Sequence, residues 1–87
     1  MPNGAHLTLA EAEPGERLEV DAILFQIVRD RCSDLGIERG TALTCTRNRE
    51  GGVAVRLPDG RSGVLERHYA WFVQTTRLPS RVRSAAG

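Results

Sequence analysis

Turn-forming residues divide this 87-residue chain into short segments, and this division limits its possible elements more than any other feature. Glycine and proline are the residues that most often interrupt regular structure, and they recur at short intervals here. They stand at Pro14-Gly15, Gly36, Gly40, Gly51-Gly52, Pro58, Gly60 and Pro79. The segments between them suit short strands or one short helix, so the pattern predicts a small domain with several strands.

Apolar and polar residues alternate in most of these segments, which is typical of half-buried strands. Strands are expected at residues 18–25, 42–47, 53–57, 62–66 and 72–78. In the last of these, Phe72 is expected in the core, and Trp71 beside it is expected on the opposite, partly exposed face. The glycines expected at turns are Gly36, Gly40, Gly51, Gly52 and Gly60.

One segment has the period of a helix instead. Within residues 24–35, the apolar residues fall on one face of a helix. They are Leu24, Ile27, Val28, Cys32 and Leu35, and we call this face the helical stripe. This spacing predicts a helix over residues 26–35 that ends at Gly36. Shorter helical turns are expected at residues 7–12 and 68–70, the first with a capping box from Thr8 to Glu11.

The expected fold is therefore mostly β. A small antiparallel sheet removes its edges by closing, which favours a five-stranded SH3-like barrel with one short helix between its first and second strands. An OB-type barrel fits less well, because its helix lies between the third and fourth strands. The expected boundaries are a flexible N-terminus at residues 1–6, the barrel at 7–78, and a disordered, Arg-bearing tail at 79–87.

Charge and hydropathy exclude several classes of protein. The chain has twelve Arg and no Lys, a net charge of +1 and an isoelectric point near 7.9, whereas nucleic-acid-binding domains are usually more basic. The longest apolar run, residues 22–25, is far too short to span a membrane. With no secretory signal visible, we expect a cytoplasmic protein without direct membrane insertion.

Residues with catalytic or metal-binding chemistry are sparse. Cys32 and Cys45 lie thirteen residues apart with no paired spacing, so both are expected to be free, buried thiols. Gly51-Gly52 lacks the lysine and the following helix of a phosphate-binding loop. We expect no enzyme activity, no catalytic residue, no metal and no cofactor, although Glu66 and His68, and Asp59, stay open as metal ligands.

Three residues are candidates for binding a partner. Arg29 and Arg31 lie on the polar side of the expected helix, and Trp71 is out of phase with the core. Exposed aromatic and Arg side chains often anchor protein interfaces. Two alternatives stay open: Trp71 could cover an end of the barrel, and the helix could close the barrel as a lid.

Several motifs together resemble the FeoA (ferrous iron transport protein A) family over residues 7–78. The most specific is Leu-Gly-Ile-x-x-Gly at residues 35–40; the others are residues 7–15, 31–34, 51–55, 64–70 and 72–73. The chain departs from the family pattern at Arg39, where proline is frequent, and at Cys32-Ser33, where a bulkier apolar pair is common. These departures bear on the partner surface more than on the fold.

The resemblance implies a cytoplasmic, non-catalytic accessory that acts on FeoB, a GTPase-containing membrane transporter of ferrous iron; homo-oligomers stay open. The alternative from the residues themselves is a small nucleic-acid-binding barrel. Its phosphate contacts would be the arginines at the hairpin ends, Arg47, Arg49, Arg56 and Arg61.

Overall fold

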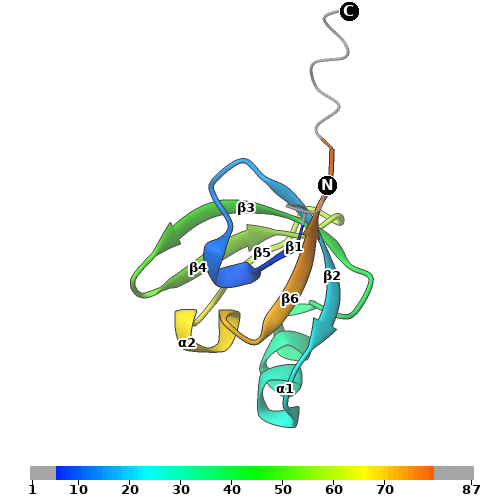
Figure 1. Ribbon diagram of the computed structural model, residues 1–87, viewed down its shortest axis with the longest axis vertical. Helices are drawn as coiled ribbons and strands as arrows, with labels where there is room; N and C mark the ends of the chain where they lie inside the picture. Colours follow the sequence, from blue (N-terminus) through cyan, green and yellow to red (C-terminus); the bar gives the residue numbers. More distant parts are fainter. Residues whose placement is uncertain (1–5, 80–87) are drawn as a thin grey trace, which may run out of the picture.

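The computed structural model describes residues 6–79, which form one antiparallel sheet with two helices and a 3₁₀ turn (Figure 1). The strands are β1 (His6–Thr8), β2 (Arg17–Ile23), β3 (Ala42–Arg49), β4 (Gly52–Arg56), β5 (Ser62–Leu65) and β6 (Val73–Arg77). The helices are α1 (Gln26–Leu35) and α2 (Arg67–Ala70), and η2 (Leu9–Glu11) is the 3₁₀ turn. The strand order is β1-β6-β2-β3-β4-β5.

The mostly β fold and the helix at residues 26–35 are confirmed, but the number of strands was wrong. The sheet has six strands because β1 was missed; its three residues are too few to show an alternating pattern. Pairing with β6 forms it, since Leu7 lies opposite Thr75 and its carbonyl oxygen accepts a bond from Thr75 Oγ1 at 2.9 Å. Helix α1 therefore follows the second strand. Residues 1–5 and 80–87 of the expected loose ends lie outside the described residues.

The predicted closed barrel is not found in the described part of the chain, because the outermost strands, β1 and β5, do not pair with each other. The sheet instead bends around its core, with register shifts in β2 and β3. Such bulges increase the local twist of a strand. The turn η2 packs against β4, β6 and α2, and α1 packs against β5.

The core lies inside this bent sheet. Its larger fully buried side chains come from every part of the chain: Leu9, Leu18, Val20, Val28, Ile37, Val53, Val55, Leu65 and Val73. One bond of the capping box predicted for the first helical turn is present: the side chain of Glu11 accepts, through Oε1, from the backbone N–H of Thr8 at 2.8 Å. This bond fixes the start of η2, which covers the core between β4 and β6.

At two of the turn positions the structure requires glycine, at Gly36 because of its backbone conformation and at Gly52 because of a close approach. Gly36 ends α1 with φ of 87°, in the left-handed region, as predicted. Gly52 is required because a Cβ there would lie 2.7 Å from Val64 Cγ1 and 2.8 Å from the carbonyl oxygen of Leu65. Of the Gly51-Gly52 pair expected at the hairpin turn, Gly52 has the positive φ, at 158°, and Gly51 does not; a Cβ on Gly51 would face open space. Gly40 and Gly60 have the predicted turn conformation.

Candidate partner-binding surface

The first half of α1 projects beyond the sheet (Figure 1). Val28 and Cys32 are buried as the helical stripe predicted, and Leu35 packs against Gly63 of β5. The stripe was wrong for Leu24 and Ile27, which are exposed. The first turn of α1 therefore buries Val28 and leaves Ile27 on its exposed side.

Phe72 was also predicted wrongly, as a core residue. The buried positions of β6 are Val73 and Thr75, so the alternating pattern is shifted by one residue and Phe72 lies outside the core. Its ring packs edge-to-face against Phe25, with the ring centres 5.1 Å apart. Trp71, expected to be partly exposed, is exposed as well.

These side chains form an exposed cluster that we call the apolar tip, defined as Leu24, Phe25, Ile27 and Phe72. Their exposed fractions are 37%, 59%, 62% and 38%, respectively. A backbone hydrogen bond joins two members of the tip: the N–H of Leu24 donates to the carbonyl oxygen of Phe72 at 2.9 Å. Exposed apolar side chains that cluster, rather than occur singly, mark contact sites.

Phe25 adopts a backbone conformation that is unfavourable for a residue with a side chain. Its φ is 66°, and it is the one non-glycine residue with positive φ in the described range. This conformation costs about 1–2 kcal/mol for a residue with a Cβ. Since the ring is more than half exposed, its burial offsets little of this cost. Strain of this kind is concentrated at functional sites.

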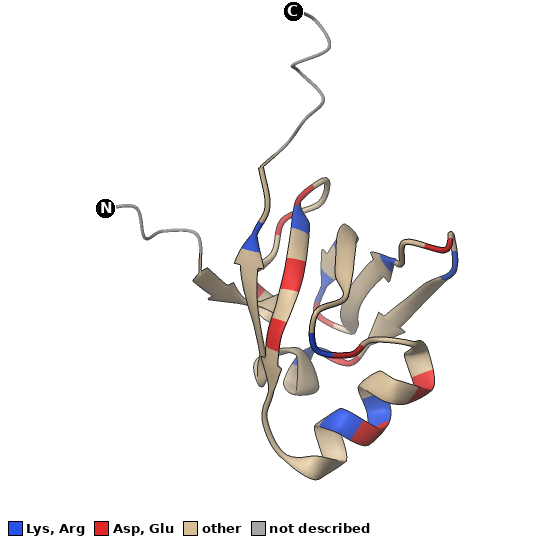
Figure 2. Ribbon diagram, turned by 90° about the vertical axis from the view of Figure 1, so that its right-hand side faces the viewer, with Lys and Arg blue, Asp and Glu red and all other residues tan. Residues whose placement is uncertain are grey.

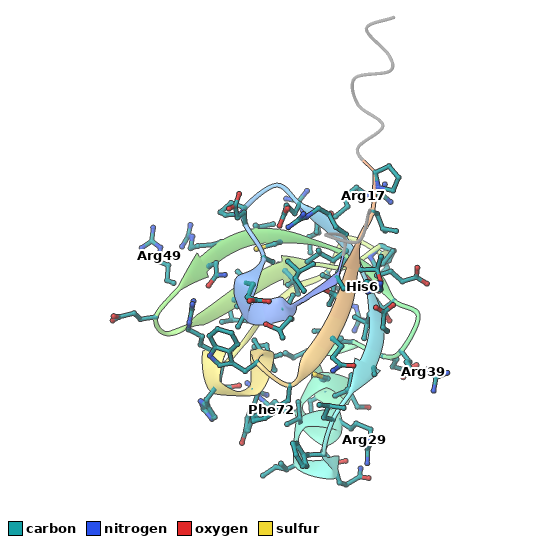
Figure 3. All side chains as sticks on the ribbon, viewed as in Figure 1. His6, Arg17, Arg29, Arg39, Arg49 and Phe72 are labelled. Atoms are coloured by element: carbon teal, nitrogen blue, oxygen red, sulfur yellow. The ribbon has the colours of Figure 1, made fainter. Side chains whose placement is uncertain are left out.

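Arg29 extends from α1 (Figure 3), and two hydrogen bonds hold its guanidinium against the turn that carries Leu24 and Phe25. Nη1 donates to the carbonyl oxygen of Ile23 at 3.0 Å, and Nη2 donates to Gln26 Oε1 at 3.2 Å. The guanidinium thus closes the turn between β2 and α1 while the side chain stays exposed. Arg29 is therefore available to a partner in a defined orientation.

A groove of about 420 Å³ runs along the other side of the same turn. Its floor is apolar, and its walls carry both signs of charge, including Arg29 and Arg39, which extend to the same side of the molecule in Figure 3. The residues that line it are Ala22, Ile23, Gln26, Arg29, Asp30, Ser33, Ile37, Glu38 and Arg39. Arg29 borders both the groove and the tip, so the two form one continuous surface.

Arg31 is used within the molecule. Its Nε donates to Glu66 Oε1 at 3.0 Å and its Nη2 donates to Glu66 Oε2 at 3.2 Å, a bidentate pair that joins α1 to the residue before α2. The hydrogen bond from Arg31 is the main reason that the pKa of Glu66 is lowered. Because both oxygens of Glu66 already accept from Arg31, this carboxylate is a poor candidate metal ligand with His68.

The Arg31–Glu66 pair predicts how stability varies with pH. Because the folded-state pKa of Glu66 lies below its ordinary value of 4.5, the pair stabilises the fold fully above that pH. This stabilisation is lost as the pH falls through the folded-state pKa. We expect Glu66→Gln to lower the melting temperature at neutral pH, and this deficit to shrink as the pH falls below about 4.5. Thermal melts followed by circular dichroism check this; a deficit that is unchanged at about pH 3 would contradict it.

The cysteines are two separate buried thiols, as expected. Burial raises the pKa of Cys32 to about 11, and burial also raises the pKa of Cys45. Thiols with a raised pKa are poor nucleophiles and poor metal ligands at neutral pH. Within residues 6–79, no group of three or more His, Cys, Asp and Glu side chains is placed to hold a metal ion. No helix in this range is long and apolar enough to cross a membrane.

The four arginines considered as phosphate contacts differ in their surroundings. Arg47, Arg49 and Arg56 are exposed on the β3–β4 hairpin, but Arg61 is bonded to Asp59 at 2.7 Å. Acidic and basic residues are interspersed on α1, and β2 carries acidic residues (Figure 2). This mixed distribution lacks the continuous basic stripe typical of nucleic-acid-binding domains.

Comparison with known proteins identifies the family and supports the fold. The model of the FeoA domain family matches residues 7–74. No curated protein matches the chain's sequence at a significant level. The FeoA protein from Chlorobium tepidum is 27% identical with a TM-score of 0.70, over 84% of this chain and 71% of that one.

Two further solved structures share the fold alone. An iron uptake regulatory protein, FeoA, has a TM-score of 0.76 at 20% identity, over 84% of this chain and 99% of that one. A manganese-dependent transcriptional repressor has a TM-score of 0.77 at 20% identity, over 88% of this chain. The chain corresponds to 39% of the repressor.

Proposed function

The chain belongs to the FeoA domain family, and we propose that it is a non-catalytic, cytoplasmic module that binds a FeoB-type ferrous iron transporter and regulates it. The observation that carries this proposal is the apolar tip, where four large apolar side chains are exposed around the start of α1 and the residue before β6. A surface of this kind suits contact with another protein and needs no cofactor.

We assign roles on this surface from the exposure of each side chain and from the hydrogen bonds it already makes. Phe25 and Ile27 would supply most of the apolar contact, since they are the most exposed members of the tip. Arg29 would add a fixed charge at its border. Arg31 would act mainly by holding α1 in place through Glu66, and Trp71 would form a neighbouring contact.

The size of the apolar tip favours a transient complex. A stable interface buries about 800 Å² on each partner. One large aromatic side chain supplies at most about 250 Å² when it is fully buried. Four partly exposed side chains therefore fall short of a stable interface by themselves, which suits a regulatory contact with a larger partner more than a permanent homodimer.

The experiment is a capture assay with the purified chain as bait. The full-length FeoB-type transporter in detergent and its separate GTPase domain are offered in parallel. We expect retention of at least one of them, reduced by Ile27→Ser. Val64→Ser is the matched control, because Val64 is an exposed apolar residue on β5, outside the tip. Retention of neither protein would contradict the proposal.

The nucleic-acid alternative is tested in the same preparation. Binding to duplex or single-stranded oligonucleotides that falls steeply with salt concentration would favour that alternative. We expect no such binding. The apolar tip has no role in phosphate contact, so Ile27→Ser would leave oligonucleotide binding unchanged and the two functions are distinguishable.

A further inference from the structure

A series of polar contacts runs from η2 to Trp71, the single tryptophan of the sequence. The side-chain amide of Asn48 on β3 donates to the carbonyl oxygens of Ala10 at 2.9 Å and Ala12 at 2.7 Å. Its Oδ1 accepts from Arg67 Nη1. The guanidinium carbon of Arg67 lies 5.7 Å from the centre of the Trp71 ring, within cation–π range. Asn48 thus fixes Arg67, and Arg67 lies over the indole.

This arrangement holds a large aromatic side chain at the surface. Trp71 is 46% exposed although its ring contacts Arg67. An aromatic side chain that is already held in one orientation loses little conformational entropy on binding. Trp and Arg are also the residue types most enriched among those that dominate binding energy.

The charge around Trp71 indicates what it would contact. Helix α2 carries Arg67 and His68 and no acidic residue, and the carboxylate of Glu66 before it is taken up by Arg31. Within residues 6–79, the guanidinium of Arg67 donates one side-chain hydrogen bond, to Asn48. Its other N–H groups are left for a partner. Guanidinium groups bind carboxylates and phosphates through charge-assisted hydrogen bonds, and a carboxylate is the one of these that an unmodified protein partner supplies.

We propose that Trp71 and Arg67 form a preorganised contact surface for an acidic segment of a partner protein, with Asn48 as the positioning residue. This inference rests on the proposed function, because the partner is taken to be the transporter. It extends that function by adding a second contact site beside the apolar tip, in which Arg67 binds a negative charge of the partner and Trp71 offers an aromatic face. Phe72 of the tip follows Trp71 directly in the chain, so one partner can reach both.

The positioning is tested in the free protein. Because Trp71 is the single tryptophan, fluorescence and near-ultraviolet circular dichroism report on this surface. We expect Arg67→Gln to raise acrylamide quenching about twofold and to weaken the near-ultraviolet tryptophan band, while far-ultraviolet spectra stay unchanged. Asn48→Ala is expected to act in the same direction. Arg56→Gln, at an exposed arginine of β4, is the control. Quenching that matches the wild type in both Arg67→Gln and Asn48→Ala would overturn the positioning role.

The contact is tested by affinity for the full-length transporter in detergent. We expect a loss of about tenfold for Trp71→Ala and for Arg67→Gln, and a smaller loss for Arg67→Lys, which keeps the charge. The affinity of Arg67→Gln is also expected to depend less on salt than that of the wild type. If both variants bind like the wild type while Ile27→Ser does not, this surface is wrong and the proposed function stands. If the wild type fails to bind, both fall.

Discussion

Replacing Gly52 with alanine is expected to lower the free energy of unfolding by about 3 kcal/mol. The new Cβ would lie 2.7 Å from Val64 Cγ1 and 2.8 Å from the carbonyl oxygen of Leu65. The second of these atoms is backbone, so β4 and β5 must move apart at a point where Val53 pairs with Leu65. For a domain of this size, we expect the melting temperature to fall by roughly 15 °C.

The neighbouring glycine is the matched control for this substitution. A Cβ on Gly51 would meet no atom within 4 Å, and its φ is outside the left-handed region. We therefore expect Gly51→Ala to melt close to the wild type. Thermal denaturation of the two variants side by side measures the difference. Equal melting temperatures for Gly51→Ala and Gly52→Ala would mean that β4 and β5 do not approach as closely as described.

Replacing Phe25 with glycine is expected to separate stability from binding. Glycine adopts positive φ without penalty, so this change removes a strain of about 1–2 kcal/mol while it deletes a ring that is more than half exposed. We expect an unchanged or higher melting temperature. The same change removes the most prominent aromatic group of the apolar tip, so affinity for the transporter is expected to fall at least about tenfold.

Phe25→Ala is the control for this prediction, because it also deletes the ring but keeps a Cβ at positive φ. We expect it to bind as weakly as Phe25→Gly and to melt at a lower temperature than Phe25→Gly. Calorimetry and binding measurements on both variants check the two parts separately. A glycine variant that is clearly less stable than the wild type would contradict the assigned strain, and full affinity would contradict the role of the ring.

The elements that the sequence predicts well are those with local signals. Helix α1 combines a helical period with a terminating glycine, and its predicted bounds, residues 26–35, agree with the structure. The strands after Gly36 agree to within two residues at either end, because turn residues separate them. Strand β1 has no such signal: it forms because a distant segment, β6, supplies its partners.

The candidate site was predicted less well, since it depends on which side of each element the rest of the chain covers. The helical stripe placed Leu24 and Ile27 in the core, but the sheet ends before it reaches them. One signal was present: in residues 22–25 four apolar residues follow one another, which breaks the alternation of a half-buried strand. The link from Asn48 to Arg67 joins residues nineteen positions apart and leaves no mark in the sequence pattern.

The most direct test of the apolar tip as the contact site is hydrogen–deuterium exchange of the chain, free and bound to the full-length transporter. We expect slower exchange on binding at residues 22–31, which include Arg29 and three residues of the apolar tip, and at residues 71–73, which include the fourth. The β3–β4 hairpin, which carries Arg47, Arg49 and Arg56, is expected to exchange equally in both states. Protection confined to that hairpin, with residues 22–31 unchanged, would contradict the apolar tip as the site of contact.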